Sequence, residues 1–181
     1  LTNLTLSIAM GDYDRTRPIH DGRVKIDGVT PITQLLSPEE MFFRAFRHEV
    51  FDVSELSFSS YCLKRAQDAS PYVAIPVFLS RAFRHSSIYI RTDKGISGPS
   101  DLKGRRMGIA EWQLTANVWA RGILEDYGVT SADIKWVRAG MHTPGRPEKI
   151  TVSLPDDVEM TAAPAGATLD QMLRDGEIDG F

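Results

Sequence analysis

Two polar segments hold residues whose types suit chemistry. Residues 11–22 follow an apolar segment and carry Arg15, Arg17 and His20, a set too polar for a protein core. Residues 57–60 read Ser-Phe-Ser-Ser and precede a stretch that is compatible with a helix. Hydroxyls and free backbone N–H groups at a helix start suit the binding of an anion. The sequence therefore predicts an anion site near residues 57–60, and residues 11–22 are the first place to look for function.

Alternating strands and helices are expected to position these segments. Strand patterns occur near residues 4–10, 29–36, 51–56, 72–78, 87–91 and 134–137, and a turn within residues 101–110 leads into a further strand. Strands that alternate with helices predict a largely parallel sheet. In such a sheet, binding sites lie at the carboxyl ends of the strands.

Three helices are expected between these strands. Ser37, Pro38 and Glu40 provide an N-cap, a first-turn proline and a capping-box glutamate, and the apolar face that follows places Phe42 and Phe46 in the core. A second helix runs from about residue 114 to residue 127 and a third from 168 to 174. The residues expected to be buried on the second helix are Ala116, Trp119, Ala120, Ile123 and Tyr127.

Composition narrows the classes of function. The chain has 181 residues, of which 42% are hydrophobic and 25% charged, and its net charge is −3. This is ordinary for a globular protein that is long enough to bury a core. No stretch combines basic residues with interleaved aromatic residues, so nucleic acid is not expected as a partner. No apolar run approaches the roughly 20 residues that cross a bilayer, so no membrane partner is expected either.

The cysteine count and the first residues bear on the compartment. Cys62 is the only cysteine, so an intrachain disulfide is impossible and a structural zinc site is not expected. Residues 1–8 alternate like a strand and lack the basic and long apolar regions of a secretory signal. We therefore expect a cytoplasmic location.

Five segments resemble known proteins. Residues 101–109, Asp-Leu-Lys-Gly-Arg-Arg-Met-Gly-Ile, are similar to the segment that opens the second lobe of type II periplasmic-binding-protein-like folds, and residues 173–180 are similar to a helix-Gly-strand step later in that lobe. Residues 11–16, 76–86 and 145–150 resemble the 4,5-dihydroxyphthalate decarboxylase family. These three segments are spread over most of the chain.

The resemblance implies a two-lobed α/β fold of the periplasmic-binding-protein-like type II class. Each lobe would be a mixed, mostly parallel sheet flanked by helices. Residues 1–94 would form the N-terminal part of the first lobe, and residues 95–181 the inserted second lobe, because the composition changes at residues 95–100. In this fold the chain returns to complete the first lobe, and no such return precedes Phe181, so we expect the first lobe to be incomplete here.

The resemblance also implies a reaction and its substrate class. It is the non-oxidative decarboxylation of a dihydroxylated aromatic dicarboxylate to a monocarboxylate and carbon dioxide, by protonation of the ring in an interlobe cleft. No organic cofactor and no metal site are expected, although a divalent metal requirement is left open. Arginine holds a carboxylate bidentately, and a helix N-terminus holds it through backbone N–H groups. The candidates for substrate binding are Arg15, Thr16, Arg17, Ser59, Ser60, Arg81, Arg84, Trp112, Gln113 and Thr115.

The proton donor must be a group that titrates near neutral pH. Imidazole does so without perturbation, which makes His85 and His20 the first candidates for the acid. A carboxylic acid with a raised pKa is the alternative, represented by Asp12, Asp14 and Glu111. An isolated histidine is more often structural, and arginine is common in surface loops.

A second class of function stays open. The commonest use of this fold is the capture of solutes between two lobes without chemistry, so the alternative is a solute-binding protein of an ABC-type transporter that takes a small carboxylate. A transcriptional regulator would need a helix-turn-helix, and none is visible in the sequence. The sequence leaves the choice between a monomer and a homo-oligomer open.

Overall fold

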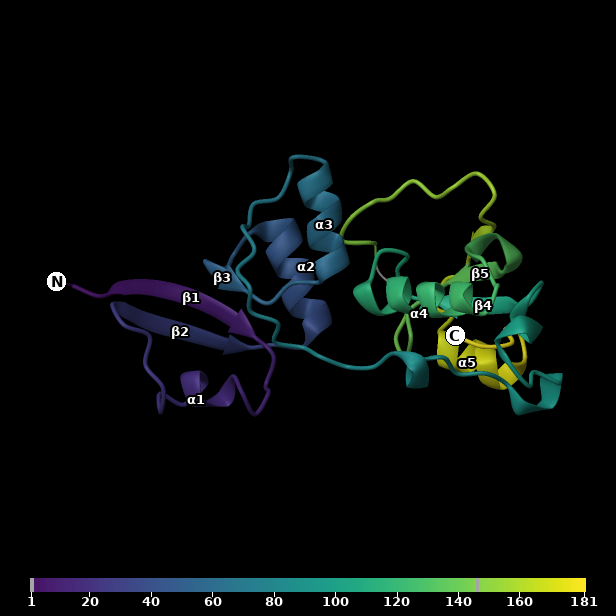
Figure 1. The fold of residues 1–181 in the computed structure, drawn as a ribbon, viewed down its shortest axis with the longest axis horizontal. Helices are drawn as coiled ribbons and strands as arrows, with labels where there is room; N and C mark the ends of the chain where they lie inside the picture. The colour runs from purple at the N-terminus through teal and green to yellow at the C-terminus, as the bar shows by residue number, and fades with distance from the viewer. Residues whose placement is uncertain (1, 146) are drawn as a thin grey trace. The chain divides into compact units, whose positions relative to one another are not determined.

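The chain folds into two compact units. The computed structural model describes residues 2–145 and 147–181 (Figure 1). The units comprise Leu1–Ala82 and Phe83–Phe181, and each contains a three-stranded sheet. All pairs between the named strands are parallel. The expectation of an α/β chain with mostly parallel sheets is thus confirmed.

The first unit has the strand order β2-β1-β3. Strand β1 (Leu4–Met10) pairs along its whole length with β2 (Val29–Leu35), whereas β3 (Val53–Ser54) adds only a short ladder on the other side. The short helix α1 (Arg17–His20) lies between β1 and β2 in the sequence, and α3 (Phe58–Ala66) follows β3.

Helix α2 (Pro38–His48) begins as its sequence predicts. Ser37 is the N-cap, and its hydroxyl accepts a hydrogen bond from the backbone N–H of Glu40 at 3.4 Å. The helix then packs Met41 and Ala45 against Ala9 of β1. This contact ties the helix to the central strand, so the polar loop that follows β1 starts from a fixed point.

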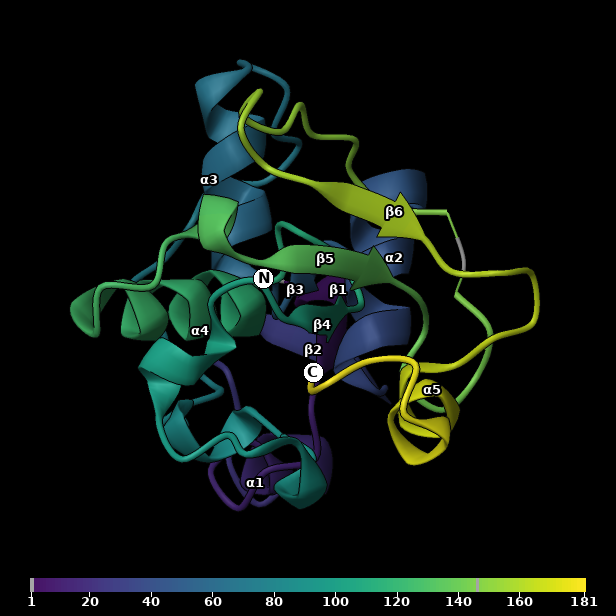
Figure 2. The same ribbon diagram turned by 90° about the vertical axis from the view of Figure 1, so that its right-hand side faces the viewer.

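The second unit is a sheet with a helix on each side. Strands β4 (Arg106–Ile109), β5 (Lys135–Arg138) and β6 (Met160–Ala162) lie in that order, with α4 (Thr115–Asp126) and α5 (Leu169–Asp175) on opposite sides (Figure 2). Because side chains alternate along a strand, Trp136 packs in the cluster with Leu124 of α4, and Val137 in the cluster with Met172 of α5. Each face of the sheet therefore has its own apolar core.

Residues 88–91 belong to the second unit. The backbone of Tyr89 exchanges two hydrogen bonds with Phe181, and Arg91 donates to Asp179. Gly180 in turn bridges to Met107 of β4. These bonds explain why the compact units divide between Ala82 and Phe83, twelve residues before the lobe boundary predicted at 94/95. The predicted strand at 87–91 is reduced to a single antiparallel bridge, between Ile90 and Gly180.

The strand predicted at residues 72–78 does not form. In the described structure of this segment the chain is irregular and mostly exposed, although Tyr72 donates its hydroxyl to the carbonyl of Phe51 at 3.1 Å. Pro76 removes a backbone donor from the middle of the run. An alternating apolar pattern becomes a strand only where a neighbouring strand accepts it.

The buried face of α4 is rotated relative to the prediction. Ala116 and Ala120 are half-buried and Leu124 is buried, at a spacing of four residues, whereas Trp119 is 63% exposed and Tyr127 55% exposed. The face toward the sheet thus follows the spacing of residues 116, 120 and 124. The prediction that Trp119 and Tyr127 are core residues was wrong.

Asp170, in the first turn of α5, is expected to make the free energy of unfolding fall as the pH is lowered into the acid range. The Thr168 hydroxyl at 2.6 Å and the His142 ring at 3.2 Å lower the pKa of Asp170 to about 2. A folded-state pKa below the ordinary value of about 3.9 means a contribution to stability that is present above about pH 4 and lost as the pH falls toward 2. Asp170→Asn is therefore expected to flatten the pH dependence of urea unfolding midpoints between about pH 4 and pH 2. Asp126→Asn, at the exposed end of α4, is the control, and an unchanged slope in Asp170→Asn would refute the assignment.

Candidate functional site

The loop after β1 is held closed by Thr16. Its side chain is buried, and its hydroxyl donates to the carbonyl of Gly11 at 2.7 Å and accepts from the backbone N–H of Tyr13 at 3.0 Å. Thr16 was predicted to bind substrate, and in the structure its hydroxyl stabilises the conformation of the loop. A substrate contact by Thr16 stays a prediction.

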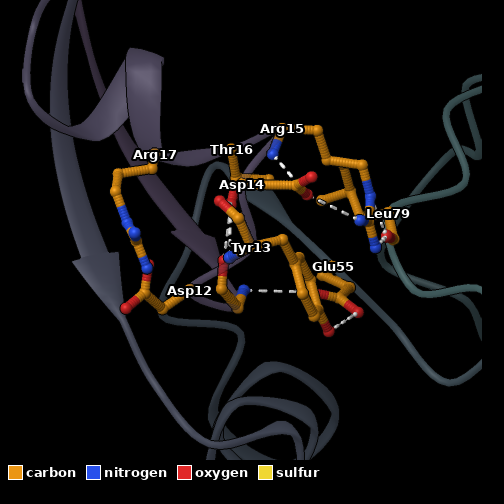
Figure 3. Close-up of polar contacts among 9 residues, drawn as sticks. Asp12, Tyr13, Asp14, Arg15, Thr16, Arg17, Glu55 and Leu79 are labelled. Carbon is orange, nitrogen blue, oxygen red and sulfur yellow. Dashed lines mark hydrogen bonds and ion pairs between the residues drawn. The ribbon is translucent and has the colours of Figure 1, made fainter.

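Glu55 joins this loop to the end of β3 (Figure 3). It accepts the Tyr13 hydroxyl at 2.9 Å and the backbone N–H of Gly11 at 3.0 Å. A Cβ on Gly11 would lie 2.6 Å from the Tyr13 ring, so another residue there would displace the ring from this position. Burial and the hydrogen bond to Glu55 raise the pKa of Tyr13. A neutral phenol and a carboxylate therefore stand together at the carboxyl ends of β1 and β3.

Tyr13→Phe is expected to destabilise the protein by roughly 1.5–3 kcal/mol, the usual worth of a hydrogen bond to a charged group. The substitution removes one of the two donors to Glu55 and leaves the half-buried carboxylate with Gly11. Urea unfolding measures the loss. Tyr127→Phe, with its ring exposed, is the control, and equal effects of the two substitutions would contradict the role of the Tyr13 hydroxyl.

The predicted arginines of the loop already have protein partners. Arg15 donates to the carbonyl of Leu79 and to Asp14, and its guanidinium carbon lies 4.5 Å from the centre of the Tyr13 ring (Figure 3). Arg17 pairs with Asp12 at 2.9 Å. The two ion pairs are at least partly exposed, so solvent and ligands can reach them. Asp12, Arg15 and Thr16 lie on the loop after β1, and Arg17 begins the helix α1 that follows it.

The predicted serines lie in the first turn of α3. Ser60 is buried, and its hydroxyl donates to that of Ser57 at 3.1 Å. Ser57, rather than Ser59 or Ser60, occupies the N-cap position. Ser60 is therefore hydrogen-bonded within the protein, Ser59 is half-buried, and substrate contacts by both serines stay predictions.

The remaining candidates of the first unit are more exposed. His20 ends α1, and its Nδ1 lies 2.7 Å from the Thr33 hydroxyl of β2. Arg81 lies in the exposed segment after Leu79, whose carbonyl binds Arg15. The backbone N–H of His20 donates to the carbonyl of Thr16 at 3.2 Å. The roles predicted for the His20 and Arg81 side chains stay proposals.

In the second unit, Arg84 and His85 lie at the first short 3-10 helix. Arg84 is its N-cap and is half-buried, and His85 is its first residue and is exposed. No hydrogen bond to the His85 ring occurs within the part of the chain that the structure describes. Its role as a proton donor is thus neither supported nor opposed by local geometry.

Trp112 is engaged in packing at the start of α4. The Arg121 guanidinium carbon lies 3.7 Å from the centre of the Trp112 ring, and the Arg121 Nη1–H donates to the Trp112 carbonyl at 2.8 Å. The Trp136 ring packs against the Trp112 ring in a T-shaped arrangement. Burial lowers the pKa of Arg121 to about 10. One face of the Trp112 ring is therefore covered by a cation, and a substrate contact by Trp112 stays a prediction. Thr115, the first residue of α4, is half-buried and stays a predicted ligand.

A buried ion pair follows the end of β4. Lys149 is 5% exposed and Glu111 is 8% exposed, and the ammonium contacts the Glu111 carboxylate directly. Gln113, also buried, donates to the same oxygen at 3.1 Å. Gln113 was predicted to bind substrate; its amide NH2 donates to Glu111, and a substrate contact by Gln113 stays a prediction. A lysine, a glutamate and a glutamine side chain are thus buried together just after the end of β4.

A pocket of about 380 Å³ lies at the same sheet edge. Arg138, the last residue of β5, is the one charged residue among its described lining residues. Its guanidinium lies 3.5 Å from the Glu148 carboxylate. The other described lining residues are alanine, glycine or proline, namely Ala110, Ala139, Pro144, Gly145, Pro147, Ala162, Ala163, Pro164, Ala165, Gly166 and Ala167.

Sequence reasoning missed five polar residues that the structure brings to these sites. Tyr13, Glu148 and Lys149 lie inside segments that carried the family resemblance. Glu55 lies one residue before the end of the strand expected at residues 51–56, and Arg138 directly follows the strand expected at residues 134–137. A search for polar residues at each expected strand end would have found the last two.

Two negative findings concern the described residues. In residues 2–145 and 147–181, no three histidine, cysteine, aspartate or glutamate side chains are grouped so that they could hold a metal ion. None of the helices described has the length and apolar character needed to cross a membrane.

The fold and the comparisons define the class of the protein. Residues 56–146 match the family described as NMT1/THI5 like, and the parallel sheets carry polar groups at their carboxyl ends as in periplasmic-binding-protein-like folds. A "4,5-dihydroxyphthalate decarboxylase" of Comamonas testosteroni is 58% identical over 181 residues, which is 99% of this chain and 55% of that protein. Another, from Pseudomonas putida, is 57% identical over 180 residues, 99% of this chain and 70% of that protein. The chain belongs to the NMT1/THI5-like family, in the group formed by these decarboxylases.

These matches confirm the resemblance seen in residues 11–16, 76–86 and 145–150. The chain spans only about 55% of the length of the Comamonas relative.

Proposed function

We propose that the protein containing this chain removes one carboxylate from 4,5-dihydroxyphthalate, or a close relative of it, as carbon dioxide. The observation that supports the proposal is 58% and 57% identity, over 99% of the chain, to two proteins named for this reaction. The residues that line the polar loop and the pocket lie within the aligned length. The small aromatic dicarboxylate is the proposed partner.

The decarboxylation requires a proton donor, and ring protonation can proceed without an organic cofactor. Each carboxylate of the substrate lies para to a hydroxyl, so protonation of the carbon that bears the carboxylate gives a dienone-like intermediate. Loss of carbon dioxide returns the electron pair to the ring and restores aromaticity. One proton is consumed, and the dicarboxylate becomes the monocarboxylate 3,4-dihydroxybenzoate. We propose that this reaction proceeds without an organic cofactor.

We propose that the arginines at the strand ends hold the carboxylate that is retained. Arg15 and Arg17 lie on the exposed rim of the β1 loop, where a ligand could displace Asp14 or Asp12 from its ion pair. We propose the same substrate-binding role for Arg81, Arg84, Ser59 and Thr115. His85 or His20 is the proposed acid. Asp12 is the weaker candidate, because its carboxylate is paired with Arg17 at 2.9 Å.

An assay of the full-length protein with 4,5-dihydroxyphthalate tests the proposal. We expect stoichiometric release of carbon dioxide and formation of 3,4-dihydroxybenzoate, followed by chromatography. Tight binding of the dicarboxylate without turnover, before and after treatment with chelator and re-addition of divalent metals, would instead favour a solute-binding protein and overturn the decarboxylase proposal.

A further inference from the structure

We propose that the pocket at the carboxyl edge of the second sheet binds an aryl carboxylate, with Arg138 contacting one of the two carboxylates of the substrate. The inference deepens the proposed function and rests on it for the identity of the acid. It adds a binding residue that sequence reasoning did not find.

The location of the pocket favours a ligand site. Ala110 directly follows β4, Arg138 ends β5 and Ala162 ends β6. Parallel α/β sheets bind ligands at this edge, because loops diverge there and leave a crevice. A volume of about 380 Å³ lies within the roughly 300–1,000 Å³ that small-molecule sites occupy.

A tight turn at residues 140–145 forms part of the pocket wall. A Cβ on Gly140 would lie 1.9 Å from the carbonyl oxygen of Thr143, so only glycine permits the tight turn. The turn brings Pro144 and Gly145 to the pocket wall. Leu169 donates its N–H to the Gly140 carbonyl at 2.8 Å, which fixes the turn to the start of α5.

The chemical character of the walls selects the ligand class. Alanine methyls and proline rings offer flat apolar surface for a ring, while Arg138 is the one formal charge among the described lining residues. A phosphate would ordinarily be met by several cations or by a set of backbone donors. One cation among small apolar lining residues fits one carboxylate of an aromatic acid and the ring that bears it.

The Arg138 side chain retains capacity for a ligand. Its contact with Glu148 spans 3.5 Å, longer than a close charge-assisted hydrogen bond of about 2.7–2.9 Å. The side chain of Arg138 is 37% exposed and that of Glu148 15% exposed. A guanidinium has five N–H donors, so the ion pair orients Arg138 and leaves donors for a carboxylate.

Calorimetric titration of the full-length protein with phthalate tests the proposal, because phthalate carries both carboxylates and lacks the hydroxyls that activate the ring. Arg138→Gln is expected to weaken phthalate binding, and to raise KM for 4,5-dihydroxyphthalate, by about 10- to 100-fold. Arg138→Lys should recover part of the loss, because the charge stays while the fork geometry is lost. Arg106→Gln, at the amino end of β4, is the matched control and should change affinity less than about twofold.

Glu148→Gln separates ligand binding from a structural role. If Arg138 serves only to pair with Glu148, Arg138→Gln and Glu148→Gln will weaken the binding of phthalate equally, and the proposal fails. The proposal also fails if Arg138→Gln keeps wild-type affinity. A wild-type protein that binds phthalate but releases no carbon dioxide from 4,5-dihydroxyphthalate would overturn the proposed function alone, since the effect of Arg138→Gln on affinity would still decide the inference. Failure of the wild type to bind either dicarboxylate would overturn both.

Discussion

Lys149→Met is expected to lower the free energy of unfolding by about 3–5 kcal/mol, the usual cost of removing one partner of a buried ion pair. The ammonium of Lys149 contacts the Glu111 carboxylate where both side chains are almost fully buried. Without it, Glu111 keeps only the Gln113 amide at 3.1 Å as a side-chain donor among the contacts described. A carboxylate left in this buried position would have no counter-charge among the described residues.

Urea unfolding of four variants, namely Lys149→Met, Glu111→Leu, their combination and a control, measures this effect. Combining Lys149→Met with Glu111→Leu should recover much of the lost stability, because an apolar pair of similar volume often replaces a buried ion pair without cost. Lys135→Met, on an exposed residue at the start of β5, should change stability by less than about 0.5 kcal/mol. A loss below about 1 kcal/mol in Lys149→Met, or a double variant less stable than either single one, would show that the pair is not a desolvated ion pair.

His85→Gln or His20→Gln is expected to reduce turnover by roughly 100-fold or more while substrate binding is kept, as removal of a general acid does. Decarboxylation needs a group that carries a proton at neutral pH and releases it to the ring, and imidazole meets both conditions. For His20, the contact of Nδ1 with Thr33 at 2.7 Å fixes the ring and directs Nε2 elsewhere. For His85, exposure in a short 3-10 helix leaves the ring accessible.

Single-turnover rates and equilibrium binding, measured separately, distinguish the roles. His48→Gln is the control, because His48 lies exposed at the end of α2 with its ring against Phe43. If His85→Gln and His20→Gln both turn over substrate at near wild-type rates, imidazole is not the acid, and a carboxylic acid takes its place. A variant that loses binding and turnover together has a positioning role instead.

The strands and helices were largely predictable because their signals are local. The alternation at residues 4–10, the Ser37-Pro38 start of α2 and the 168–174 pattern each require only a few neighbours, and each is confirmed within one or two residues. The failures at residues 72–78 and at Trp119 have another cause. Whether a pattern pairs as a strand, and which face of a helix turns inward, depends on partners distant in the sequence.

The site was predictable only where the sequence gathers its residues. Asp12, Arg15 and Arg17 lie close together in the sequence and were recognised together. The Tyr13–Glu55 hydrogen bond joins residues 42 apart and the Lys149–Glu111 pair joins residues 38 apart. Neither contact can be predicted from a local sequence pattern. Thr16 and Ser60 show the converse limit, because hydroxyls that look available in sequence are buried and shape the backbone in the structure.

Incubation of the full-length protein with 4,5-dihydroxyphthalate in deuterium oxide tests the central claim most directly. Protonation of the ring by a solvent-exchangeable acid predicts one deuterium in the 3,4-dihydroxybenzoate product, at the carbon that lost its carboxylate, and one carbon dioxide per product molecule. Proton NMR shows the missing ring signal, and mass spectrometry shows the added mass. Recovery of unchanged dicarboxylate from a protein that binds it would contradict the account, as would product that carries protium at that carbon.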